Sequence, residues 1–251
     1  MRSSNPALTD KVFASVTTLS TDRVSDPRVS MDQMTIGGTV NKSFILLALV
    51  LSSSIYAWDY ASLGVTPPWF IPLILSAFGV SLVIIFKRTT APYLAPVYAL
   101  LEGGGLGLIS GIYEMQYQGI VLQAVLCTIG TFLSLLIAYK SRLIKVTENF
   151  KLGLFAATGG IAIVYLINFI MSFFGKSIPM IHESGAVGIG FSVFVVIIAA
   201  LNLVMDFDFI ERGAKRGAPK YMEWYAAFGL LVTLVWLYLE MIRLLGKSRR
   251  R

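Results

Sequence analysis

Residues 185–205, GAVGIGFSVFVVIIAALNLVM, form an apolar stretch of 21 residues without one charged side chain. About 20 consecutive apolar residues are needed for an α-helix to cross the hydrocarbon core of a bilayer. This stretch therefore predicts a membrane-spanning helix. The rest of the chain has the same character, because 56% of its 251 residues are hydrophobic and only 14% are charged, whereas an ordinary soluble domain carries about 25% charged residues.

Six more apolar segments lie on either side of this stretch, separated by polar connections. Their approximate bounds are 43–58, 69–86, 92–113, 119–139, 153–174 and 224–245. We therefore predict an all-α, polytopic membrane protein with seven transmembrane helices. Its expected parts are a polar N-terminal cytoplasmic tail at 1–41, a seven-helix domain at 42–246 and a basic C-terminal tail at 247–251. No apolar segment precedes Ser43, so we expect the first span to be retained rather than cleaved as a signal peptide.

The basic residues indicate the orientation of these helices. Lys and Arg gather in the N-terminal tail and in every second connection, whereas the connections between those hold a single basic residue, Lys176. Because cytoplasmic loops carry the excess of Lys and Arg, the N-terminus is expected in the cytoplasm. Seven crossings then leave the basic C-terminal tail on the far side. Either the last segment re-enters its own side or the earlier loops overrule the tail, and the length of 224–245 favours full crossing.

Several function classes find no support in the sequence. The net charge of +7 comes from short clusters between apolar segments, which is typical of topology signals and contacts with lipid headgroups rather than of a nucleic-acid surface. Cys127 is the single cysteine, and the single histidine, His182, lies beside Glu183 in a connection. His182 and Glu183 alone do not provide enough ligands for a metal site. We expect no enzyme, no cofactor and no nucleic-acid partner.

Glycines in the third apolar segment predict close helix packing. Gly107 and Gly111 form a GxxxG pair, and three further glycines precede them at 103–105. Small residues at this spacing let two helix backbones approach each other in a membrane. We interpret the motif as internal packing, with dimerisation as the less favoured alternative.

Carboxylates within or at the ends of apolar segments are the candidate functional residues. A charge near the bilayer centre costs roughly 2.5–3.5 kcal/mol on insertion scales, so each should face the bundle interior, a partner or water. Glu102 lies in the middle of the third segment, where it either bonds a neighbouring backbone or has a functional role. Asp206 and Asp208 end the sixth segment about 200° apart around the helix, so both cannot face one site. We expect Asp208 at the aqueous cytoplasmic end.

Glu240 lies inside the last apolar segment. Arg243 follows it by three residues on the same helix face, so the two side chains can neutralise each other. Alternatively, Arg243 reaches outward to the interface and leaves Glu240 to another partner. Glu240 lies roughly 24 Å along the helix from Trp224, whereas Asp206 lies near the opposite end of its own segment. Straight-helix geometry therefore does not bring Asp206 and Glu240 together.

Stretches along nearly the whole chain carry a resemblance to a known family, including 4–8, 38–42 and 157–160 and the four longest. The four longest are APYLAPVYALLEG at 91–103, LNLVMDFDFIERG at 201–213, APKYMEWY at 218–225 and LVWLYLEMIRLL at 234–245. Together they resemble the Bax inhibitor-1/YccA family, and within it the bacterial Bax inhibitor 1-like subgroup with a long N-terminal tail. The resemblance implies a bundle in which the last helix is central, located in the bacterial inner membrane. It also implies a pH-sensitive calcium leak.

In that family two aspartates, one near the end of helix six and one in helix seven, share a proton and sense pH. The resemblance places the first at Asp206, with Asp208 as the alternative, and the second at Glu240, where this chain has a glutamate instead of the aspartate. Two carboxylates at about 4 Å repel by roughly 4 kcal/mol at an effective dielectric of 20, so such a pair titrates as a unit. Loss of the shared proton would attract a hard cation such as calcium, which prefers oxygen ligands.

The resemblance also supports a second function. Members of the family are associated with the regulation of a membrane protease or of cell-death and stress-response partners. The polar N-terminal tail would offer such a partner a docking segment. The expected partners are therefore membrane lipids, calcium ions and, in this alternative, another membrane protein.

Overall fold

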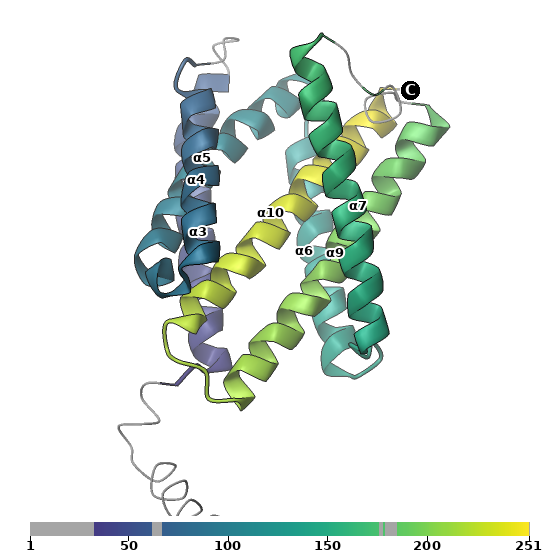
Figure 1. Cartoon of the computed structure of the whole chain (residues 1–251). Coiled ribbons are helices and arrows are strands. Elements are labelled where there is room, and N and C mark those ends of the chain that lie inside the picture. Colours follow the sequence, from purple (N-terminus) through teal and green to yellow (C-terminus); the bar gives the residue numbers. More distant parts are fainter. Residues whose placement is uncertain (1–32, 62–66, 176–177, 179–184, 251) are drawn as a thin grey trace, which may run out of the picture.

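The computed structural model describes residues 33–61, 67–175, 178 and 185–250 (Figure 1). In these ranges the chain is helical throughout its regular structure, which confirms the all-α prediction. The α-helices are α3 (Ile36–Ala61), α4 (Phe70–Phe86), α5 (Ala91–Gln116), α6 (Ile120–Lys140), α7 (Glu148–Phe173), α9 (Ala186–Lys215) and α10 (Met222–Arg249). A short 3₁₀ turn, η2 (Arg88–Thr90), joins α4 to α5.

Six of these seven helices are long and apolar enough to cross a membrane. The seventh, α4, has 17 residues, which is at the lower end of the length that spans a hydrocarbon core. Within the described residues, the predicted number of helices is therefore confirmed, with α4 as the shortest of the seven. Residues 1–32, most of the predicted N-terminal tail, lie outside the described residues.

Several helix ends differ from the predicted segments, and three of them change the predicted division into tail and spans. Helix α3 begins at Ile36, so residues 36–41 belong to the first helix rather than to the tail. Helix α9 continues to Lys215 although its apolar stretch stops at Met205, because Phe207 and Ile210 continue its buried face into the core. Helix α10 continues to Arg249, so the expected C-terminal tail from 247 is largely helical.

Helix α10 is the centre of the bundle. It packs against α3, α5, α6 and α9, and Figure 1 shows it running obliquely between them. Its first turn lies at the beginning of α3, where Thr35 contacts Glu223, and its last turn lies at the α5–α6 connection, where Arg249 contacts Gln118. The last helix therefore runs from one end of the bundle to the other, as full crossing requires, and its central position is confirmed.

The glycines of α5 bring it close to α3. A Cβ atom added at Gly103 would lie 2.8 Å from the Cα atom of Val50, and one added at Gly107 would overlap the backbone of Ser54 in the same way. Ser54 also donates a hydrogen bond from its hydroxyl to the carbonyl of Gly103 at 2.8 Å. The glycine motif therefore serves packing within the chain, as we predicted.

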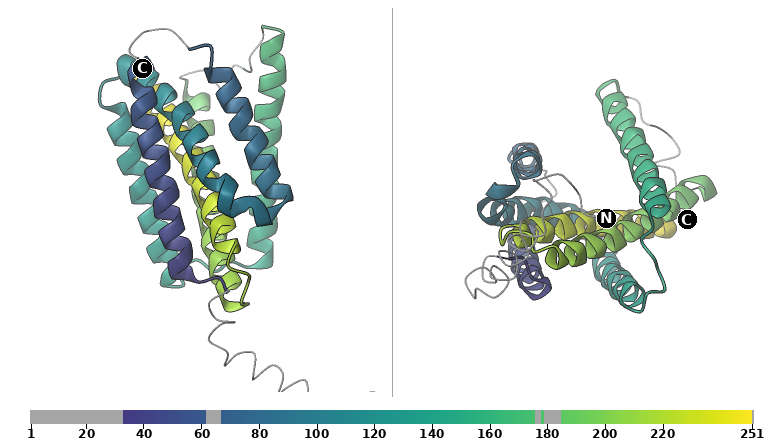
Figure 2. Two further views of the ribbon diagram at one scale, coloured as in Figure 1. Left: turned by 90° about the vertical axis from the view of Figure 1, so that its left-hand side faces the viewer. Right: turned by 60° about the horizontal axis from the view of Figure 1, so that its bottom comes forward.

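Helices α4 and α7 lie at the periphery. Helix α4 packs against α5, whereas α7 packs against α9, and the two views of Figure 2 show both at the outside of the bundle. Their outward side chains are apolar and exposed, among them Phe78 on α4 and Phe155 on α7. In a membrane these faces contact lipid.

Candidate functional site

A cavity of about 680 Å³ lies between α4, α5, α9 and α10. Two of the predicted carboxylates, Asp206 on α9 and Glu102 on α5, are part of its lining. The remaining wall is mainly apolar and aromatic, since α4 and α10 contribute Ile, Val and Phe side chains to it. Two acidic groups thus share a mostly apolar space inside the bundle.

Asp206 is the cavity carboxylate with an unused oxygen, and outside the cavity lining the Oε2 atom of Glu240 is buried without a hydrogen-bond partner as well. The Oδ2 atom of Asp206 is buried and, like that of Glu240, has no hydrogen-bond partner among the described residues. The hydroxyl of Thr233, on the facing side of α10, lies within hydrogen-bonding reach of the same carboxyl group. Burying a carboxylate oxygen without a hydrogen-bond partner is unfavourable, unless the oxygen is protonated or binds a water molecule or a cation.

Glu102 reaches the same cavity from α5. Its carboxyl group is hydrogen-bonded to the hydroxyl of Tyr98, one helical turn earlier. The ring of Tyr98 in turn meets Phe228 of α10 edge to face, with 5.0 Å between ring centroids. For Glu102 the sequence left open a bond to a neighbouring backbone or a functional role. Its observed partner is a side chain of its own helix and it lines a cavity, which favours the functional role.

Asp208 is turned to a different environment. It forms an ion pair with Arg212, one turn later on α9. The cavity lining includes Arg212 but not Asp208. The side chains of Asp206 and Asp208 therefore lie in different environments, in agreement with their angular separation on the helix.

Glu240 forms a second polar cluster, further along α10. Its Oε1 atom accepts hydrogen bonds from Arg243 at 2.6 Å and from the hydroxyl of Tyr165 at 2.9 Å. Arg243 also donates to the Tyr165 oxygen at 2.8 Å. Glu240 is only 1% exposed, so the positive charge of Arg243 compensates a buried negative one. Of the two alternatives for Arg243, the ion pair is the one observed.

Asp206 and Glu240 do not form the pair that the family resemblance implied. Asp206 lies beside Thr233, and Glu240 lies seven residues further along α10, about 10 Å on a regular helix. Each carboxylate has its own partners. The physical reason is that α9 and α10 run antiparallel with Ser192 beside Lys247, a register that places Glu240 beyond Asp206. The cavity instead combines Asp206 with Glu102.

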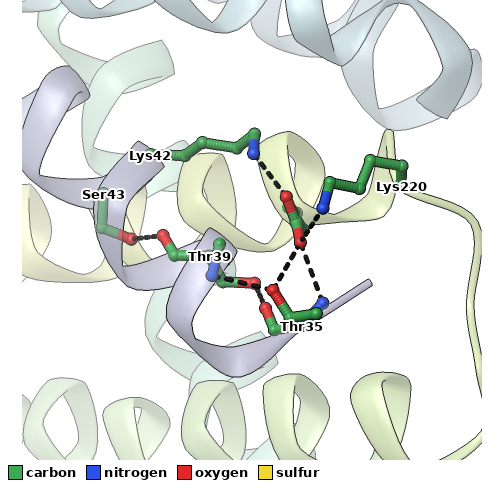
Figure 3. Close-up of polar contacts among 7 residues, drawn as sticks. Thr35, Thr39, Lys42, Ser43 and Lys220 are labelled. Carbon is green, nitrogen blue, oxygen red and sulfur yellow. Dashed lines mark hydrogen bonds and ion pairs between the residues drawn. The ribbon is translucent and has the colours of Figure 1, made fainter. Parts of the chain in front are cut away.

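The sequence analysis missed a buried carboxylate at the beginning of α10. Glu223 is 0% exposed and accepts hydrogen bonds from the backbone nitrogen and the hydroxyl of Thr35, both at 2.9 Å. It also forms ion pairs with Lys42 and, at 3.5 Å, with Lys220 (Figure 3). We call these four residues the Glu223 clasp. A lone glutamate in a first helical turn between a lysine and an apolar segment was the available signal.

The basic C-terminal residues also have a structural use that the sequence analysis missed. Lys247 is buried and donates hydrogen bonds to the carbonyl of Gly188 and to the hydroxyl of Ser192, at 3.1 and 2.8 Å. Arg249 donates to the carbonyl of Gln118 and the side chain of Gln123. These contacts hold the last turn of α10 against α9 and the α5–α6 connection. They explain basic residues at an end where positive-inside expects few.

The described residues contain no group of three or more His, Cys, Asp or Glu side chains that could hold a metal ion. His182 and Glu183 lie outside the described ranges. Any cation in the cavity would therefore meet at most two carboxylates, with hydroxyl groups or water as its other ligands. That donor set fits transient contact with a hard cation rather than a tightly held one.

A bundle of apolar helices around a central last helix, with carboxylates buried between helices, defines a polytopic membrane protein. The model of the family described as Bax inhibitor 1 like matches residues 5–250, and the chain belongs to that family. This agrees with the resemblance found in the sequence. A comparison with curated proteins gave no match.

Proposed function

We propose that this protein is a pH-responsive cation leak of a bacterial inner membrane, with calcium as the transported ion and the N-terminus in the cytoplasm. The observation that supports it is the cavity inside the bundle that carries both Asp206 and Glu102. Ionisable residues within membrane helices commonly mark ion pathways or proton relays. The family resemblance supports calcium as the ion.

Protonation would control this leak through the charge of the cavity. With both carboxyl groups neutral, the mostly apolar wall offers a cation little compensation for its lost hydration. With Asp206 ionised, its free oxygen becomes an anionic ligand, and the hydroxyl of Thr233 and incoming water can supply further oxygens. Cation flux should therefore rise as pH rises. Glu240 forms an ion pair with Arg243 outside the cavity lining, so we assign the pH response to the cavity carboxylates instead.

The arrangement described here would be the closed state. Beyond the cavity, Tyr238 of α10 and Ser110 of α5 are hydrogen-bonded at 2.6 Å, and Leu106 packs in the same core cluster. A continuous pathway therefore requires α10 to move relative to α5. Charge repulsion after deprotonation provides a reason for such a movement.

Calcium flux into proteoliposomes across a pH series tests this proposal. The expected result is a pH-dependent flux in wild type that Asp206→Asn and Glu102→Gln flatten. Glu148→Gln is the matched control, because Glu148 is outside the cavity lining and its side chain is 87% exposed, and Glu240→Gln distinguishes the cavity pair from the family pair. A pH profile lost in Glu240→Gln but kept in Asp206→Asn would overturn our choice of carboxylates. Calcium flux in wild type that does not depend on pH would overturn the pH response, and no flux at any pH would overturn the leak itself.

A regulator that binds a membrane protease or a stress-response protein is the second candidate. The contacts of the residues that follow position 32 favour this candidate, because they connect the N-terminal region to the bundle. The backbone nitrogen of Met34 donates a hydrogen bond to the carbonyl of Ala218, in the α9–α10 connection, at 2.6 Å. Deleting residues 1–32 leaves these contacts intact. If partner capture is lost while proteoliposome flux is unchanged, the tail has the binding role and the bundle has the leak.

A further inference from the structure

We infer that the cavity lined by Asp206 and Glu102 is a binding site for a hydrophobic monovalent cation, such as an amphiphilic amine or a quaternary onium ion, that arrives laterally from the lipid. This inference concerns occupancy of the cavity and does not depend on whether ions pass through it. It rests on the size of the cavity, the chemistry of its wall, its acidic groups and the side on which it opens.

The size of the cavity favours an organic ligand. At about 680 Å³ it falls within the range of roughly 300–1,000 Å³ that is typical of small-molecule sites, whereas a water molecule in liquid occupies about 30 Å³. A bare metal ion would use only a corner of it.

Aromatic rings form one continuous part of the wall. Phe209 meets Tyr225, Tyr225 meets Phe228, and Phe228 meets Tyr98, with centroid distances of 6.2, 6.5 and 5.0 Å. All four rings line the cavity. Aromatic faces attract organic cations by cation–π interaction while also contacting their apolar groups. The ring series therefore suits a ligand that is positively charged and largely hydrophobic.

The acidic groups suit one positive charge. Glu102 is already hydrogen-bonded to Tyr98, whereas the Oδ2 atom of Asp206 is buried and unpartnered among the described residues. One ammonium or onium group beside Asp206 would compensate this oxygen. A second positive charge would have no equivalent acceptor in the cavity lining.

The cavity opens on a surface that faces lipid. Lining residues on α4 and α9 are at the same time exposed at the outside of the bundle, with Phe78 at 61%, Ile74 at 42% and Phe209 at 38%. These exposed side chains are apolar, so the opening presents no charge to a ligand dissolved in the bilayer. The basic residue of the lining, Arg212, is paired with Asp208. A hydrophobic cation that partitions into the membrane therefore has an uncharged route to Asp206.

Equilibrium dialysis of tetraphenylphosphonium against the protein in lipid nanodiscs, with empty nanodiscs as background, tests the inference. The expected result is saturable binding of one ion per chain. Tetraphenylborate has nearly the same shape and the opposite charge, and it should show no saturable binding above background. Asp206→Asn should weaken tetraphenylphosphonium binding at least tenfold, whereas the control variant Glu148→Gln, whose side chain is 87% exposed outside the cavity lining, should bind as wild type does.

Gly229→Leu provides a second variant that keeps every charge. Gly229 lines the cavity, and a Cβ atom there would meet no atom within 4 Å, so a leucine would fill the space without displacing a helix. It should also weaken binding at least tenfold. Equal binding of the two probe ions, binding unaffected by both Asp206→Asn and Gly229→Leu, or no saturable binding because a lipid chain holds the cavity would each overturn the inference. A flux result alone would not, because binding is measured without an ion gradient.

Discussion

Replacing Glu223 by alanine should destabilise the protein more than any other single change in its charged residues at this end of the bundle. Glu223 is fully buried and joins Thr35 and Lys42 of the N-terminal region to the first turn of α10. Alanine would leave the donors of Thr35 without their acceptor and Lys42 without its counter-ion. The Glu223 clasp would then be broken at its centre.

The expected magnitude follows from these contacts. Hydrogen bonds to a charged group contribute about 1.5–3 kcal/mol each, and removing one member of a buried ion pair costs about 3–5 kcal/mol. Because all the contacts share one carboxylate, their effects do not add. We therefore expect Glu223→Ala to lower the free energy of unfolding by about 3–5 kcal/mol, the range for a broken buried ion pair.

Denaturant unfolding in detergent micelles measures this loss, and hydrogen exchange at residues 35–39 shows whether the beginning of α3 is released. Glu148→Ala is the matched control, because Glu148 forms an ion pair with Lys151 while its side chain is 87% exposed, and it should cause no measurable change. The double variant Lys42→Met with Glu223→Ala should lose less stability than the sum of the two single variants. Strict additivity, or an unchanged Glu223→Ala protein, would refute the clasp.

Two further predictions concern packing and the second polar cluster. Gly107→Leu should lower the unfolding midpoint in detergent, because its side chain would overlap the α3 backbone at a cost of about 1–3 kcal/mol for an overpacked contact; Gly130→Leu, where a Cβ atom meets nothing within 4 Å, should leave the midpoint unchanged. Arg243→Met should cost about 3–5 kcal/mol in chemical unfolding by leaving Glu240 buried without its counter-ion; adding Glu240→Met should restore most of that stability, and a further loss in the double variant would contradict the ion pair.

The helices were predictable because apolar segments long enough to cross a bilayer leave little alternative. Their ends were less predictable, since an end depends on contacts outside the apolar segment. Residues 36–41 are helical, and their helix buries Thr39 in the core. The polar sequence of these residues had predicted a tail. Helix α9 likewise continues through Asp206 and Asp208, where hydropathy indicates that the span ends.

The candidate site was predictable only residue by residue. Intramembrane carboxylates are conspicuous in a sequence because their burial is unfavourable, and Asp206, Glu102 and Glu240 were found in this way. Which of them face one another depends on the register of α9 against α10 and on the position of α5, neither of which hydrophobic periodicity encodes. Glu223 and Lys247 were missed for a related reason. Each lies near the end of an apolar segment, where a charged residue is ordinary, and only tertiary packing buries it.

The clasp and the cavity lie on the same short part of α10, which connects the two proposed functions physically. Glu223 belongs to the first turn, and Tyr225 and Ala226, immediately after it, line the cavity. A helix turn is rigid along its hydrogen bonds, so a shift of Glu223 moves these two side chains with it. The N-terminal region that follows residue 32 is bound to Glu223 through Thr35. A partner that pulled on the tail would therefore act on the wall of the cavity, and the leak and the partner-binding role need not exclude each other.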